Sequence, residues 1–159
     1  MIYRVVGPSR SGKTKYLRKK ASDGGFFVPF PPDEIFITSS VKEELKFEGI
    51  KMNELPWFED PEIPPIMLPH TLKELLAIAV AVKFCERKNC KVLSIDEPFI
   101  LFSEDEEDQE IVKKMCKLME EFSKNGDLYY SHRQHLKDPA HEFLSGALDI
   151  KLDKTEKGK

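Results

Sequence analysis

The stretch GPSRSGKT at residues 7–14 decides more about this 159-residue chain than any other part of it. It fits the pattern G-x-x-x-x-G-K-[ST] of a phosphate-binding loop. Residues 2–6 before it are typical of a short buried strand, and residues 15–21 after it predict a helix without internal Gly or Pro. The motif requires this strand–loop–helix context, which disfavours the alternative of an accidental glycine-rich turn. We therefore expect a nucleotide site here.

The chemistry of this loop follows mostly from its backbone. Gly7 and Gly12 let the chain wrap so that successive N–H groups point at phosphate oxygens, and the helix starting near Gly12 adds the positive end of its dipole. Lys13 can bridge the β- and γ-phosphates, and the Thr14 hydroxyl can ligate Mg²⁺. ATP and Mg²⁺ are the expected ligands. The predicted nucleotide-binding residues are Gly7, Pro8, Ser9, Arg10, Ser11, Gly12, Lys13 and Thr14.

Two adjacent carboxylates, Asp96 and Glu97, follow the largely apolar residues 91–95. Neighbouring residues at the end of a strand point in different directions. A nucleoside triphosphatase needs one carboxylate for Mg²⁺ and another to orient or deprotonate the attacking water. We assign Asp96, with Thr14, to the metal and Glu97 to the water. The alternative is an acidic turn that leaves the sheet.

A histidine ends the predicted strand at residues 127–131. His132 could reach the γ-phosphate there and couple its presence to movement of the chain. The catalytic residues predicted are thus Glu97, Lys13 and His132. The alternative for His132 is a surface histidine that begins a turn.

The remaining pattern alternates strands with helices. Strands are predicted at residues 26–28, 91–95, 127–131 and 148–152, and helices at 39–47, 71–87, 105–124 and 139–144. Thr71 and Glu74 have the spacing of a capping box at the start of the helix 71–87. Such alternation predicts an α/β domain with a mainly parallel sheet, here a three-layer P-loop NTPase domain. We expect one domain over residues 1–159, with a proline-rich insert at 51–69 and a frayed tail at 153–159.

Composition excludes several classes of protein. The net charge of −3 gives no indication of nucleic-acid binding. No apolar run approaches the roughly 20 residues of a membrane span, and the N-terminus lacks a secretory pattern. We expect a cytoplasmic protein, or one peripheral to a membrane through a partner. The three cysteines have no paired C-x-x-C spacing, which favours reduced thiols over a metal site.

With these motifs in place, the chain resembles the ATP-binding subunits of ABC transporters, especially the cobalt and energy-coupling-factor branch. KVLSIDEP at residues 91–98 is similar to the family's K-V-L-I-L-D-E-P, and LLAIA at 75–79 to its R-V-A-I-A. PPDEIFITSSVKEELKFEG at 31–49 resembles NPDDQLF…TVEEELAFG. His132 falls at the family's switch histidine. The resemblance implies an ABC-ATPase-like core whose strand 127–131 lies between strands 2–6 and 91–95, gathering Lys13, Asp96 and His132 around one phosphate.

The departures from the family concern elements that act between subunits. The family's glutamine aligns with Pro29, and its LSGGQ signature aligns with LPHTL at 68–72, without either glycine. The helical subdomain that docks on a membrane partner is reduced to residues 51–67. We therefore expect a minimal ATPase that hydrolyses slowly, or with an unrelated partner. A second copy of the chain or another protein remains open as a partner, whereas a membrane transporter is disfavoured.

Two other functions compete with a slow ATPase. A nucleotide-dependent regulatory switch with little hydrolysis is favoured by the loss of the elements that act across a dimer. A small-molecule kinase shares the phosphate loop, but the arginine-bearing lid of such kinases is missing from residues 51–67. We rank the kinase below the other two.

Overall fold

Five short strands form one parallel sheet in the computed structural model, which describes residues 1–8, 10–35, 45, 47, 49–134, 136–144 and 146–153. The strands are β1 (Ile2–Gly7), β2 (Phe26–Val28), β3 (Val92–Ile95), β4 (Asp127–Arg133) and β5 (Leu148–Lys151). The helices are α1 (Lys13–Lys20), α2 (His70–Lys88) and α3 (Glu106–Ser123). The predicted helix at 39–47 lies almost entirely outside the described residues. The predicted helix at 139–144 is a 3₁₀ turn, Pro139–Glu142.

The sheet has the order β2-β3-β4-β1-β5, and each neighbouring pair is parallel. Parallel pairs need crossover connections, and the chain supplies them through α1, α2 and α3. This confirms the predicted α/β class with a parallel sheet. Strand β4 lies between β1 and β3, as predicted, so the carboxyl ends of these three strands meet at one edge.

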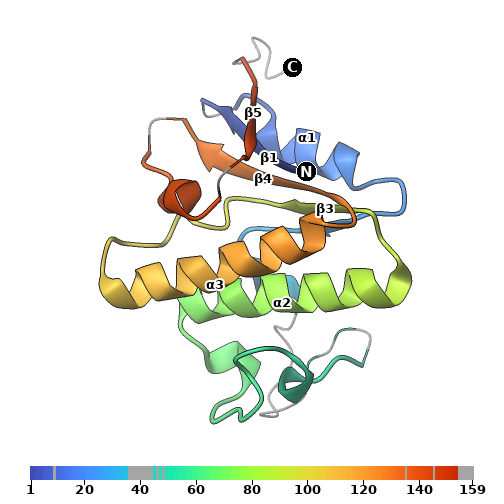
Figure 1. The fold of residues 1–159 in the computed structure, drawn as a ribbon, viewed down its shortest axis with the longest axis vertical. Helices are drawn as coiled ribbons and strands as arrows, with labels where there is room; N and C mark the ends of the chain where they lie inside the picture. Colours follow the sequence, from blue (N-terminus) through green and yellow to red (C-terminus); the bar gives the residue numbers. More distant parts are fainter. Residues whose placement is uncertain are drawn as a thin grey trace.

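Helices cover both faces of the sheet (Figure 1), which gives three layers. Helix α1 packs on one face, where Leu17 joins Val5 and Tyr129 in a small apolar cluster. Helices α2 and α3 pack side by side on the other face, over Leu128 and Tyr130. Side chains alternate between the faces of a strand, so the odd-numbered residues of β4 face α1 and the even-numbered ones face α2 and α3.

The start of α2 differs from the prediction. The helix begins at His70 with Pro69 as its N-cap, and no side chain caps it. The predicted capping box of Thr71 and Glu74 is therefore wrong. Glu74 is instead buried on the helix, at 1% exposure. Since Pro69 has a fixed φ and the helix can begin directly after it, a threonine cap was not needed to start the helix.

Residues 51–69 contain no long helix, as the prolines predict, but two 3₁₀ turns, Met52–Glu54 and Pro65–Met67. Phe58 is buried in the main core, whereas Trp57 stays partly exposed with the Lys114 ammonium 5.5 Å from its ring centroid. Figure 1 shows this segment beneath α2, on the side away from the sheet. Among the described residues, none of the helices combines the length and apolar character needed to cross a bilayer.

Candidate functional site

Residues 7–14 connect β1 to α1, and the local backbone geometry requires a glycine at two of these positions. A Cβ on Gly7 would lie 2.5 Å from Ser11 Oγ and 2.8 Å from the Leu152 carbonyl oxygen, so no larger residue fits. Gly12 is the N-cap of α1 with φ of 88°, a left-handed conformation that glycine adopts without strain. The predicted site residue Ser9 lies outside the described residues. The glycines thus bend the chain tightly between strand and helix.

Lys13 is the first residue of α1 and reaches back across the loop. Its Nζ donates hydrogen bonds to the carbonyl oxygens of Gly7 at 2.7 Å and Pro8 at 3.0 Å, and the residue is 8% exposed. Burial lowers the pKa of Lys13; the Glu97 carboxylate opposes this shift, and the Arg133 charge adds to it. The ammonium is therefore held inside the loop, where an anion would compensate its lost hydration.

A chain of hydrogen bonds joins α1, β3 and β4. Thr14 Oγ1 donates to Asp96 Oδ2 at 2.8 Å, and Ser131 Oγ donates to Asp96 Oδ1 at 2.8 Å. Ser131 Oγ also accepts the Glu97 N–H at 2.8 Å. Glu97 has a φ of 43°, which is unusual for a residue with a side chain and occurs often at functional positions. The Ser131 hydroxyl holds both acidic residues in place at the end of β3.

Arg133 faces Glu97 at the same edge. Its Nε lies 3.4 Å from Glu97 Oε1; the arginine side chain is 47% exposed and the glutamate side chain 17%. Arg133 is the last residue of β4 and pairs in register with Gly7, the last residue of β1. The last residue of β4 therefore places a positive charge beside the first residue of the loop.

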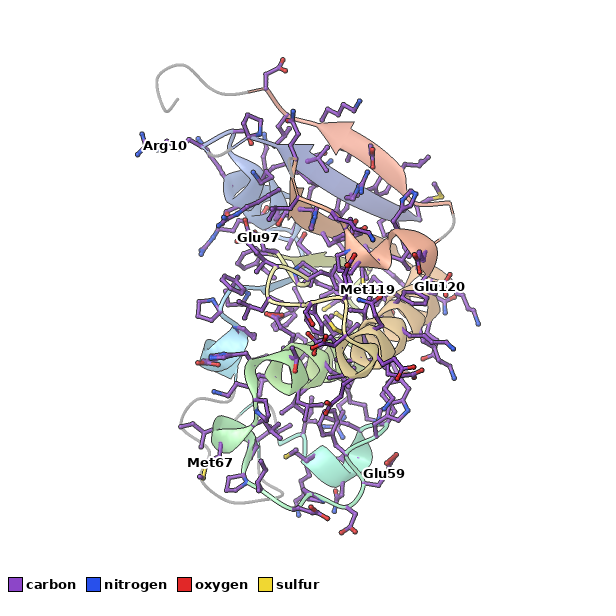
Figure 2. All side chains as sticks on the ribbon, turned by 90° about the vertical axis from the view of Figure 1, so that its left-hand side faces the viewer. Arg10, Glu59, Met67, Glu97, Met119 and Glu120 are labelled. Atoms are coloured by element: carbon purple, nitrogen blue, oxygen red, sulfur yellow. The ribbon has the colours of Figure 1, made fainter. Side chains whose placement is uncertain are left out.

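A pocket of about 430 Å³ lies beside these residues, within the usual range for small-molecule sites. Its lining includes Lys13, Glu97 and Arg133 but not Asp96 or Ser131. Figure 2 shows Arg10 and Glu97 at one end of the molecule, away from Met67 and Glu59 at the other. The lining contains four cations and one carboxylate in a chain that is acidic overall, which favours an anionic ligand. It consists of Arg10, Ser11, Gly12, Lys13, Thr14, Lys15, Glu97 and Arg133.

His132 does not line this pocket. It is 4% exposed, and its Nε2 lies 3.2 Å from the Leu136 carbonyl oxygen. By the alternation along β4, His132 lies on the face covered by α2 and α3, together with Tyr130. The structure thus brings Lys13, Thr14, Asp96 and Glu97 together and leaves His132 outside their contacts.

Besides Lys15, which lines the pocket, the site residues that the sequence prediction did not select are Ser131 and Arg133 of β4. Both contact the acidic pair after β3, whereas His132 between them does not. The sequence contains the period of two along β4, but only the structure shows that Tyr129 packs against α1, the helix that carries Thr14. Extending that period by two and four residues places Ser131 and Arg133 on the same face.

The oxygens of Thr14 and Asp96 fit a hard cation such as Mg²⁺. Magnesium binds in proteins through one or two carboxylates, waters and phosphate oxygens of a substrate, and seldom through a complete protein cage. The described part of the chain has no group of three or more His, Cys, Asp or Glu residues arranged for a metal ion. An ion here would depend on a phosphate ligand as well as on Thr14 and Asp96.

Comparison with known proteins adds no assignment. No model of a protein family matches the sequence, and no curated protein matches it.

Proposed function

We propose that residues 7–14, Asp96 and Glu97 form a site that binds ATP with Mg²⁺ and hydrolyses it slowly. The observation that carries this proposal is the 2.8 Å contact between Thr14 Oγ1 and Asp96 Oδ2. Residues 82 positions apart bring a hydroxyl and a carboxylate together beside a loop whose sequence is that of a phosphate-binding loop. A structural turn alone would not require this pairing.

Each side chain has a distinct part in the proposed reaction. Lys13 binds the phosphates, and Thr14 with Asp96 would hold a magnesium ion, which supplies positive charge to neutralise them. Glu97 accepts a proton from the attacking water. The water oxygen bonds to the γ-phosphorus while the bond between the γ-phosphorus and the β–γ bridging oxygen breaks. The electron pair of the broken bond leaves with ADP, and Glu97 later releases the proton to solvent.

The resemblance to ABC-type ATP-binding subunits is part of this proposal. The position of β4 between β1 and β3 supports it. A regulatory switch is the second candidate, and the contact of Glu97 with Arg133 favours it, because this contact occupies a carboxylate oxygen that a general base would need. Both candidate functions require ATP binding, and they differ in whether the bound ATP is hydrolysed.

Phosphate release from Mg·ATP, measured for wild type and Glu97→Gln with ATP affinity on the same samples, tests the proposal. We expect the variant to keep its affinity and to lose turnover by about 10²–10⁴-fold, the usual contribution of a general base. Glu120→Gln, an exposed position on α3, is the matched control and should leave both unchanged. Equal turnover in Glu97→Gln would rule out Glu97 as the base, and binding without turnover in wild type would favour the switch.

Lys13→Ala tests the binding half of the proposal. Removing the ammonium inside the loop should abolish measurable ATP binding, because its charge compensates the phosphates. Lys19→Ala, exposed on the same helix, should bind as wild type does. Unchanged binding by Lys13→Ala would contradict a phosphate site in this loop.

A further inference from the structure

Arg133 is one of the pocket cations to which the proposed reaction gives no part, and it is the one that comes from β4. It ends β4 beside Gly7 and lines the same pocket as Lys13, Thr14 and Glu97. Arg133 belongs to β4 and not to the loop that follows β1. Its side chain therefore approaches the pocket from the side of β3 and β4. That is the side on which Glu97 lies.

The contact between Arg133 and Glu97 is weak enough for another anion to displace Glu97 from Arg133. The Nε–Oε1 distance of 3.4 Å is long for a charge-assisted hydrogen bond, and the arginine is half exposed. Exposed ion pairs of this kind contribute little stability. A phosphate group carries more charge than a carboxylate and can accept two hydrogen bonds from the planar guanidinium, whereas the contact with Glu97 is made through Nε. A phosphate entering the pocket would therefore compete well for Arg133.

The charges around the pocket point the same way. Arg133 lies close enough to Lys13 that the two cations repel, although the attraction between Lys13 and the Glu97 carboxylate is the larger of the two effects. An anion between the two cations would relieve that repulsion. The terminal phosphate of a nucleotide bound in the loop is the group that Lys13 also contacts in the proposed complex.

We propose that Arg133 is a catalytic residue, an arginine supplied by this chain itself that leaves Glu97 and binds the γ-phosphate. The proposal rests on the proposed function above. Glu97 then loses its cation only when a γ-phosphate is present, so the base becomes free at the moment when it is needed. As the water oxygen bonds to the γ-phosphorus and the bridging oxygen departs with ADP, the guanidinium stabilises the charge on the γ-phosphoryl oxygens. Glu97 takes the proton of the water.

The test compares triphosphate and diphosphate binding in Arg133→Ala and Arg133→Lys. The probes are ADP and the non-hydrolysable β,γ-imido analogue of ATP, each with Mg²⁺, and turnover of ATP is followed in parallel. We expect Arg133→Ala to bind the imido analogue about tenfold more weakly and ADP within about twofold of wild type. Turnover should fall about 10²–10³-fold, the cost of removing one donor to transition-state charge. Arg133→Lys should recover part of the affinity, because it keeps the charge without the planar fork.

Arg87→Ala, on the last turn of α2, is the matched control and should leave affinities and turnover unchanged. Thermal unfolding of each variant verifies that it is folded. Unchanged triphosphate affinity with unchanged or faster turnover in Arg133→Ala would overturn the proposal, because Arg133 would then only restrain Glu97. Equal weakening for both nucleotides would also overturn it. Failure of wild type to bind either nucleotide would instead overturn the proposed function, which separates the two results.

Discussion

Two buried serines near the candidate site differ in what their hydroxyls contact. Ser131 Oγ bonds to the Asp96 carboxylate and to the Glu97 N–H, and Ser131 is fully buried. Ser94 is equally buried on β3, but its hydroxyl has no hydrogen-bond partner among the described residues. Only the first of these hydroxyls connects two strands through the acidic pair.

Ser131→Ala is expected to lower the free energy of unfolding by about 1–2 kcal/mol, because the partly buried Asp96 oxygen and Glu97 N–H lose their partner. Turnover of ATP, if the proposed function holds, should fall about 10–100-fold with ATP binding retained, as for other residues that position a catalytic group. Ser94→Ala is the control and should be neutral or slightly stabilising. Chemical denaturation of the two variants measures the difference, and equal stabilities would contradict the positioning role of Ser131.

At the scale of elements, the first turns of α2 carry a buried acid into the core. Glu74 is 1% exposed, and its Oε1 has no hydrogen-bond partner within the described ranges. Burial, and then the charges of Asp33 and Asp96, raise the pKa of Glu74 well above its ordinary value. The neighbouring Lys73 pairs with Asp33 at 3.5 Å. The helix therefore holds Glu74 in its protonated form over an extended pH range.

This raised pKa predicts a pH-dependent stability. Above pH 4.5, the ordinary value of a glutamate, the unfolded chain releases the Glu74 proton while the folded protein keeps it. The free energy of unfolding then falls as pH rises, at about 1.4 kcal/mol per pH unit until the folded group also titrates. Glu74→Gln removes this dependence.

Denaturant unfolding at several pH values between 4.5 and 8 measures the effect. Glu74→Gln should become more stable relative to wild type as pH rises across this window. Glu86→Gln, exposed on the same helix, should keep a constant difference from wild type. Parallel curves for wild type and Glu74→Gln would contradict the burial of a protonated acid.

At the scale of the whole molecule, one buried carboxylate ties the far edge of the sheet together. The Asp138 side chain is 3% exposed and accepts hydrogen bonds from Arg4 Nη1, the Tyr130 hydroxyl and the Ala140 N–H. Arg4 also forms two bonds to Asp149, at 2.8 and 2.9 Å. Residues of β1, β4 and β5 thus share one network. The mostly exposed edge strand β5 is joined to the sheet through this network as well as through its backbone pairing with β1.

Asp138→Ala is expected to cost about 1–3 kcal/mol of unfolding free energy, because the buried Tyr130 hydroxyl and the Ala140 N–H lose their partner, while Arg4 keeps its two bonds to Asp149. Glu104→Ala is the control: Glu104 pairs with Lys137 at 2.8 Å, but these side chains are 81% and 73% exposed. Removing such an exposed pair should produce no measurable change. Equal midpoints of unfolding for the two variants would contradict the role of Asp138.

The sequence by itself determined the class of fold and the first half of the candidate site. Alternating apolar segments and helical periods predicted strands close to β1, β2, β3, β4 and β5, because both signals are local. The loop at 7–14 and the Asp96–Glu97 pair were recognisable for the same reason, since each is a short pattern with its own chemistry. The position of β4 between β1 and β3 was also predicted, from the resemblance to ABC-type ATP-binding subunits.

Only the tertiary structure decided which side chains at the edge of the sheet meet. The sequence drew attention to His132, yet the alternation of β4 turns Ser131 and Arg133 toward the acidic pair and His132 toward the Leu136 carbonyl oxygen. The burial of Glu74 was missed because a capping pattern and a core position share the same spacing. In both cases the outcome depends on which strand or helix lies opposite, and that information exists only once the elements pack.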